Sequence, residues 1–153
     1  MSSRKFFDYD DISYYFNNFD EHKLSELNSG QYKSADDSLK MGVITGRIPN
    51  DILDLDFIDK LEYFGYEKSI VDKSKFKDID QIFIEKPLLD YPVSSCIYVY
   101  RDILIFKKKG MVVGTAKICF TCNDSQIKGT DASTEMFGQD GDYERLKKVL
   151  KNH

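Results

Sequence analysis

The stretch CIYVYRDILIFKKKGMVVGTAKICFTC, residues 96–122, constrains the fold more than any other part of the chain. Two runs rich in Tyr, Val, Ile and Phe flank the polar tip KKKG. Such residues are enriched in strands, and a glycine-containing polar tip between two of them indicates a β-hairpin. We therefore predict an antiparallel hairpin of residues 94–107 and 111–122, which forms the centre of a sheet.

The register of this hairpin follows from the choice of turn. A three-residue loop, Lys108-Lys109-Gly110, suits a type I turn followed by a left-handed glycine. Residues that face each other then have numbers that add up to about 218. In that register the even positions form an almost wholly apolar face, which we predict to be the core, and the odd positions mix apolar with polar side chains such as Lys117. The even positions are Tyr98, Tyr100, Leu104, Phe106, Val112, Ala116, Ile118 and Phe120.

Three helices are predicted from hydrophobic periodicity. Ile12, Tyr15, Phe16 and Phe19 stand at helical spacing and predict a helix over 11–27. The same reasoning predicts helices over 54–64 and 142–151. Residues 30–50 read as a long connection with a short strand at 41–45, and residues 75–85 read as a helical turn followed by a strand at 81–85.

These elements predict one α+β domain over residues 1–153. We expect an antiparallel sheet of about three to five strands built on the hairpin, with helices packed on one face. In this reading the N-terminal half, 1–66, is helical, and residues 80–151 supply the sheet and the C-terminal helix. A chain of 153 residues has about the length of one domain.

The charge of the chain is uneven. Its formal net charge is −4, but residues 1–90 hold 19 acidic and 12 basic side chains, whereas residues 91–153 hold 7 acidic and 10 basic ones. An acidic chain is poorly suited to bind a phosphate backbone, so we expect no nucleic-acid partner. A charged partner is expected to be a basic protein, although the charges are equally explained by solvation of the surface.

No apolar run is long enough to span a membrane, and the acidic residues near the start do not fit a signal peptide. We therefore expect no membrane partner and a cytoplasmic protein, or a secreted one whose leader is removed. Three cysteines cannot all pair within one chain, which favours a reducing compartment, although one disulfide and one free thiol also fit.

The cysteines form the first candidate site. In the 218 register Cys96 lies opposite Cys122, close enough for contact or a disulfide, while Cys119 points to the other face. A zinc site would use Cys96, Cys119, Cys122 and His22 if the first helix packed against this end of the sheet. The competing interpretation is that the thiols are buried small hydrophobic groups.

The second candidate site is Tyr100-Arg101-Asp102, a polar interruption of an apolar strand. It is interpreted either as an exposed edge or bend with an ion pair, or as an anchor for an acidic group or a partner. The spacing of Cys96, Tyr100-Arg101-Asp102 and Ile118-Cys119-Phe120 with Cys122 resembles a pattern in a group of small uncharacterised bacterial proteins. The resemblance covers roughly residues 94–145, including FGQDGDYERL. It implies that the hairpin and the last helix form one unit, and it brings no activity.

Two functions are predicted. The first is a non-enzymatic protein-binding module, for example an inhibitor or immunity-type protein for a basic partner, with no cofactor. The absence of a linear catalytic motif favours it, because the chain has no phosphate-loop ending and only two histidines. The alternative is a thiol site that binds zinc or cycles a disulfide through Cys96, Cys119 and Cys122.

Overall fold

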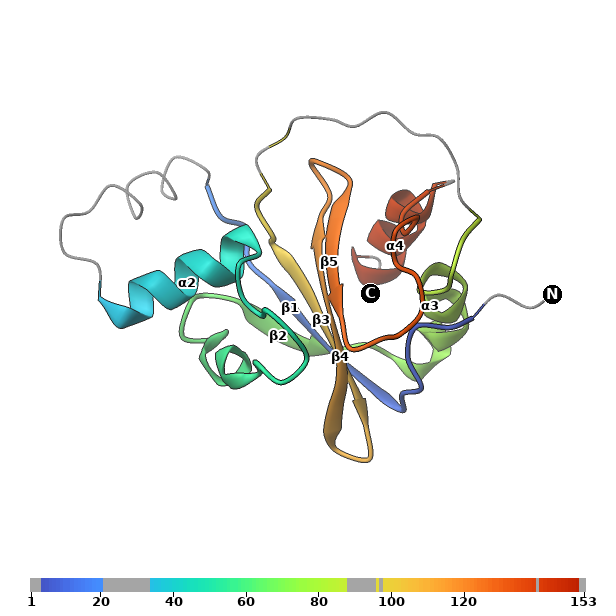
Figure 1. Ribbon diagram of the computed structural model, residues 1–153, viewed down its shortest axis with the longest axis horizontal. Helices are drawn as coiled ribbons and strands as arrows, with labels where there is room; N and C mark the ends of the chain where they lie inside the picture. Colours follow the sequence, from blue (N-terminus) through green and yellow to red (C-terminus); the bar gives the residue numbers. More distant parts are fainter. Residues whose placement is uncertain (1–3, 21–33, 88–95, 97, 140, 152–153) are drawn as a thin grey trace.

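A computed structural model describes residues 4–20, 34–87, 96, 98–139 and 141–151. Its centre is a five-stranded antiparallel sheet with the strand order β2-β1-β3-β4-β5 (Figure 1). The predicted α+β class is confirmed, and the hairpin strands β3 and β4 lie in the middle. The strands are β1 Asp11–Phe16, β2 Glu67–Ile70, β3 Asp102–Lys108, β4 Met111–Cys119 and β5 Asp124–Lys128.

Helices cover both faces of this sheet rather than one (Figure 1). The helix α2 and the 3₁₀ turn η1 lie on one face, and α3 and α4 pack against each other on the opposite face. The one-face prediction was wrong because the odd positions Ile103 and Ile105 are as apolar as the even ones and need a cover of their own. The helical elements are α2 Ala35–Thr45, η1 Asp56–Lys60, η2 Lys73–Lys75, α3 Phe76–Ile82 and α4 Asp142–Lys151.

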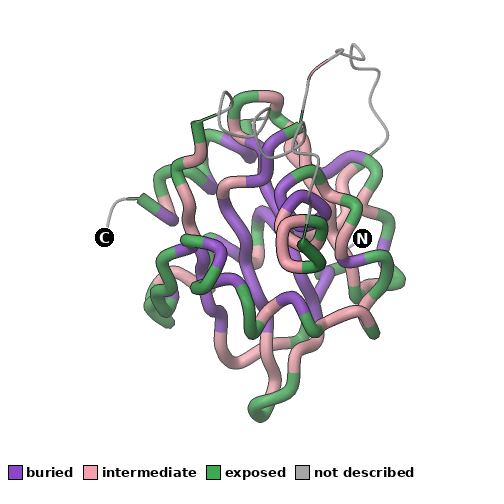
Figure 2. The backbone as a smooth tube through the Cα atoms, turned by 90° about the vertical axis from the view of Figure 1, so that its left-hand side faces the viewer, coloured by how far each residue is buried: buried purple, intermediate pink, exposed green. Residues whose placement is uncertain are grey.

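Two hydrophobic cores result, one on each face. The even-face core contains Leu104, Phe106, Ala116 and Ile118 together with residues of α3 and α4. The odd-face core joins Ile103 and Ile105 to residues of α2 and η1. Figure 2 shows buried backbone along the central strands and exposed backbone at the outer turns. The predicted even-face core is therefore correct for these four hairpin positions, but it is one of two.

The register of the hairpin differs from the predicted one. Lys108 faces Met111, so the turn has two residues, Lys109 and Gly110, both with positive φ. A β-bulge between Phe106 and Lys107 then shifts the pairing, and Leu104 faces Ala116. The predicted sum of 218 was wrong, because beyond the bulge the sum is 220. Beyond the bulge the faces were assigned correctly, since a shift of two residues leaves a side chain on its side. Near the hairpin tip they were not, because Val112 packs on the odd-face core and Val113 on the even-face core.

The predicted helix over 11–27 is wrong where the structure describes it, because residues 11–16 form strand β1 between β2 and β3. Positions 12–15 are all buried, since both faces of β1 are covered. A strand buried on both faces shows no alternation, so its apolar residues also matched a helical period. Residues 21–27 lie outside the described part. In the described part of residues 1–66, the predicted helical half contributes strand β1 to the sheet as well as the helix α2 and the 3₁₀ turn η1.

The region 30–50 contains a helix where a connection and a strand were predicted. Ser34 caps α2 by accepting from the Asp37 amide, and the Asp37 side chain accepts from the Ser34 amide. This capping box satisfies amides that the first turn leaves without partners. Gly46, with φ of 91°, ends the helix in the left-handed conformation.

The other elements follow the predictions in part. The predicted helix over 54–64 is reduced to η1 and the turns after it. The helical turn near 75–80 is confirmed as α3, but α3 extends to Ile82, and the predicted strand over 81–85 is reduced to one bridge between Ile84 and Lys5. The helix α4 is confirmed with the predicted bounds. Within the described ranges, no helix is long and apolar enough to cross a bilayer.

Candidate functional site

The segment of residues 51–63, which contains η1, presents both charge and apolar surface to solvent. Phe57 and Leu61 are buried in the odd-face core and fix the segment to the sheet. Its first turn is closed by the Asp51 carboxylate, which accepts from the Leu53 amide at 2.8 Å. The segment is therefore held by its own apolar anchors and turn, while its other side chains point outward.

The outward side chains of this segment are acidic and apolar. Asp51, Asp56, Asp59 and Glu62 are exposed, and Asp54 is partly exposed. Lys60 is the one basic residue of the segment. Its Nζ lies 2.6 Å from Asp36, and this is the one ion pair that the segment forms among the described residues. Five acidic side chains and one lysine give the segment a formal charge of −4, as large as that of the whole chain.

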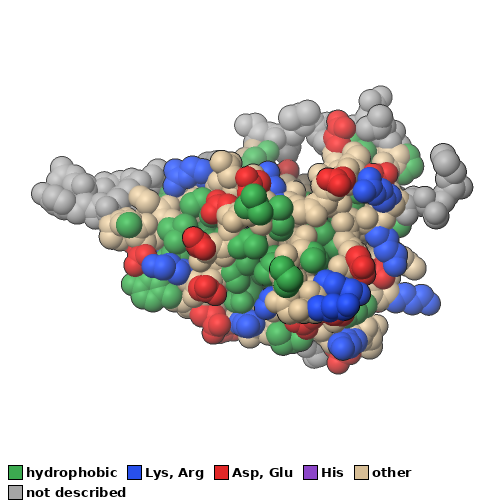
Figure 3. All heavy atoms as spheres, turned by 60° about the horizontal axis from the view of Figure 1, so that its bottom comes forward, with side chains coloured by type: hydrophobic (Ala, Val, Ile, Leu, Met, Phe, Trp, Pro, Cys, Tyr) green, Lys and Arg blue, Asp and Glu red, His purple; other side chains and the backbone are tan. Residues whose placement is uncertain are grey.

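Two large apolar side chains stand among these charges. Leu53 is 88% exposed and Tyr63 is 74% exposed. Figure 3, which views the molecule from the side of the hairpin tip, shows hydrophobic side chains gathered near the middle of this face and acidic ones close around them. Met111, at the tip of the hairpin, is 73% exposed. We call the outward side chains of residues 51–63 the acidic surface.

The second candidate from the sequence, Tyr100-Arg101-Asp102, leads into the central strand β3 and is not an exposed edge, because Tyr100 and Asp102 are buried. Tyr100 is buried, and its hydroxyl donates to Asp124 at 2.9 Å. Arg101 is half-buried and donates from Nε to the Phe19 carbonyl at 3.0 Å. The structure thus gives all three residues internal partners, including Asp102.

Asp102 is a buried carboxylate, 2% exposed, beneath the end of α4. It accepts a hydrogen bond from the Tyr14 hydroxyl, and Lys151 Nζ lies 3.8 Å from its Oδ2. Burial raises the pKa of the Asp102 carboxyl, and the Tyr14 hydrogen bond and the nearby cations Lys151, Arg101 and Lys147 oppose that rise. Asp102 is thus a buried acidic group that contacts the even-face core through Tyr14.

One pair of cysteines, Cys96 and Cys122, lies together as predicted. Cys96 and Cys122 form a disulfide with their Cα atoms 5.9 Å apart, although neither lies within a paired strand. Cys119 is a buried free thiol at the end of β4. The fourth residue of the zinc prediction, His22, lies outside the described residues. In the described part of the chain, no group of three or more His, Cys, Asp or Glu side chains could hold a metal ion.

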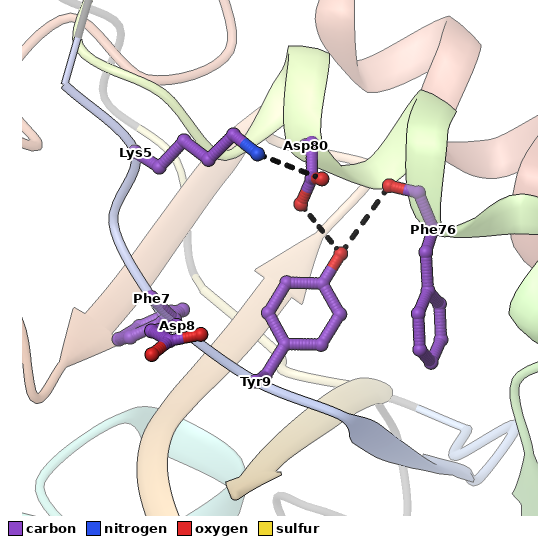
Figure 4. A pocket seen from close by; sticks show the side chains of 6 residues that line it. All are labelled: Lys5, Phe7, Asp8, Tyr9, Phe76 and Asp80. Atoms are coloured by element: carbon purple, nitrogen blue, oxygen red, sulfur yellow. Dashed lines mark hydrogen bonds and ion pairs between the residues drawn. The ribbon is translucent and has the colours of Figure 1, made fainter.

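A separate pocket of about 380 Å³ lies between the N-terminal segment and α3 (Figure 4). Tyr9 donates from its hydroxyl to Asp80 at 2.7 Å and to the Phe76 carbonyl at 3.3 Å, and Lys5 pairs with Asp80 at 3.1 Å. Burial, aided by Asp80, raises the pKa of Tyr9. Lys5, Tyr9 and Asp80 are joined by these bonds and fasten residues 5–9 to α3, whereas Asp8 pairs with Lys108 outside the pocket.

Comparisons with protein-family models, with curated proteins and with solved structures found no match to this chain. The resemblance of residues 94–145 to small bacterial proteins therefore stays a prediction. Function has to be inferred from the surfaces and pockets of the molecule.

Proposed function

We propose that this protein is a non-enzymatic protein-binding module whose acidic surface engages a basic partner, in the manner of an inhibitor or immunity-type protein. The observation that carries the proposal is the exposure of Leu53 and Tyr63 among the carboxylates of residues 51–63. Protein interfaces commonly combine a few apolar or aromatic anchors with a polar rim.

The charges of the acidic surface support a basic partner. Asp56, Asp59 and Glu62 are exposed, and a basic surface opposite them gains attraction and a faster association. The buried anchors Phe57 and Leu61 hold the backbone of the segment in place before a partner arrives. Such preorganisation reduces the entropy that binding costs.

The proposal is tested by capture of a partner from the native cell extract at moderate salt. We expect the immobilised protein to retain one basic protein in stoichiometric amount. The variant D56N/D59N/E62Q and the variant L53S/Y63S should each lose most of it. Matched controls change the same number of exposed carboxylates elsewhere, D131N/E135Q/E144Q, or an exposed apolar residue on β2, I70S. The proposal is contradicted if no stoichiometric partner is recovered. It is also contradicted if D56N/D59N/E62Q and the control D131N/E135Q/E144Q retain equal amounts of the partner.

A second candidate function is thiol chemistry at Cys96, Cys119 and Cys122, and the Cys96–Cys122 disulfide favours it. In a cycle, two electrons and two protons from a dithiol reductant convert this disulfide to two thiols, and the reductant becomes a disulfide. Zinc would need the reduced form, because thiolates are the ligands. Thiol counting in redox buffers and native mass spectrometry with zinc test this candidate. A disulfide that resists glutathione and a reduced protein that takes up no zinc would exclude it.

A further inference from the structure

A pocket of about 330 Å³ opens between the end of α4 and the edge of the sheet formed by β1 and β2. Tyr14 and Phe16 of β1 and Leu150 of α4 line its apolar part, and the polar residues around it are Glu67, Lys68, Ser69 and Lys151. Pockets for small molecules are mostly apolar with a few polar groups that fix orientation. The pocket lies on the even face of the sheet, away from the odd-face core that holds residues 51–63.

The position of the Lys151 ammonium is fixed from two sides. Its Nζ lies 3.9 Å from the centre of the Phe16 ring and 3.8 Å from Asp102 Oδ2. The Asp102 carboxylate also accepts from Tyr14, so it is shared between two donors. An ammonium has three N–H donors, and the Lys151 side chain is 38% exposed, so it can still donate to a ligand.

The surroundings favour a negative ligand despite the acidic chain. A second hollow, lined by Glu144, Lys147, Lys148 and Lys151, adjoins the pocket at Lys151. These cations offset the negative end of the α4 dipole. Glu67 opposes them on the β2 side, which disfavours a ligand with two negative charges.

We propose that this pocket binds a small monoanion with an apolar tail, of the short-chain fatty carboxylate class, with its carboxylate on Lys151 and its tail along Tyr14, Phe16 and Leu150. The volume of the pocket is at the lower end of the range for small-molecule sites, roughly 300–1,000 Å³, so the tail is short. The proposal does not depend on the protein-binding function, because the two sites lie on opposite faces.

The test is a titration of the ¹⁵N-labelled full chain with octanoate, followed by amide chemical shifts. We expect saturable shifts that concentrate at residues 14–16, 67–69 and 150–151. Octanol, which has the same tail and no charge, should bind at least about tenfold more weakly, because it lacks the charge-assisted contact with Lys151. Shifts that map elsewhere, or equal binding of octanol, overturn the proposal.

Variants separate the role of charge from that of structure. K151M should lower octanoate affinity about tenfold, K151R should retain it within a few-fold, and E67Q should raise it a few-fold because a repelling charge is removed. K77M removes an exposed lysine of α3 and serves as the matched control, with no expected change. Equal affinities for K151M and K77M overturn the proposal. If K151M does not fold, the test is the octanoate affinity of E67Q compared with that of the unchanged chain. If E67Q does not bind octanoate more tightly, the proposal is contradicted.

Discussion

Lys117 shows at the scale of one residue what the sequence could not reveal. It was grouped with the mixed odd positions, yet its side chain is fully buried in the structure. Its Nζ donates to the carbonyls of Val43 and Ile48 and lies 5.3 Å from the centre of the Phe57 ring. Val43 is in the last turn of α2, where carbonyls lack partners within the helix. A polar residue in a strand reads as solvent-facing unless the helix that covers it is already known.

Burial lowers the pKa of Lys117 from 10.5 to about 7, and Asp54 weakly opposes the shift. Between these two values the unfolded chain binds more protons than the folded one, so stability should rise as pH rises from about 7 towards 9. The gain has an upper limit of about 1.4 kcal/mol per pH unit. Denaturant unfolding of the unchanged chain and of K117M at several pH values measures it. Parallel pH profiles of the two proteins would contradict the lowered pKa.

Tyr14 and Asp102 make a second prediction at this scale. Y14F removes the donor to a buried carboxylate, and we expect a loss of about 1–3 kcal/mol in the free energy of unfolding. The same change in a D102N background should cost less, because no charged acceptor remains. Y98F, at a position 40% exposed, is the control and should change stability by less than about 0.5 kcal/mol. Equal costs in both backgrounds would show that the pair is not coupled.

At the scale of elements, periodicity predicted the sites of burial better than the type of element. The apolar residues of 11–16 were predicted to form one face of a helix, but their spacing fits a helix and a doubly buried strand equally well. The helix α2 was missed although its capping box stands in the sequence as Ser34 and Asp37, because Gly42 and Gly46 weaken a helical reading. A Cβ at Gly42 would lie 2.7 Å from Cδ1 of Ile48, so the end of that side chain would have to shift.

Gly114 of β4 has a similar role, which yields a prediction about strand packing. A Cβ at this position would overlap the ring of Phe7, which packs against Phe106 with ring centres 4.6 Å apart. We expect G114A to lower stability by about 1–3 kcal/mol through overpacking. The cost of G114A should shrink in an F7L background, because the smaller side chain makes room. M111A, at the exposed end of the same strand, is the control and should change stability little. Thermal or denaturant unfolding of all these variants measures the differences in stability.

At the scale of the whole molecule, the uneven charge of the sequence becomes a difference between surfaces. The acidic first part supplies residues 51–63 on the odd-face side, and the lysines of α4 line the hollow that adjoins the pocket on the even face. Counting charges showed that the N-terminal part of the chain is acidic. It could not show that Leu53 and Tyr63 remain exposed, because exposure depends on which neighbours the other elements bring.

The Cys96–Cys122 disulfide links the chain ahead of β3 to the turn after β4, across a sequence separation of 26 residues. A bond that closes a loop of this size restricts the unfolded chain and contributes about 2–4 kcal/mol. We expect C96S/C122S to lower the midpoint of denaturant unfolding, and dithiothreitol to lower that of the unchanged chain by a similar amount. Dithiothreitol should have no effect on the variant, which controls for Cys119 and for the reductant itself. The opposite result would be an unchanged unfolding midpoint in dithiothreitol although thiol counting shows that the disulfide is reduced. It would mean that the bond does not stabilise the folded chain.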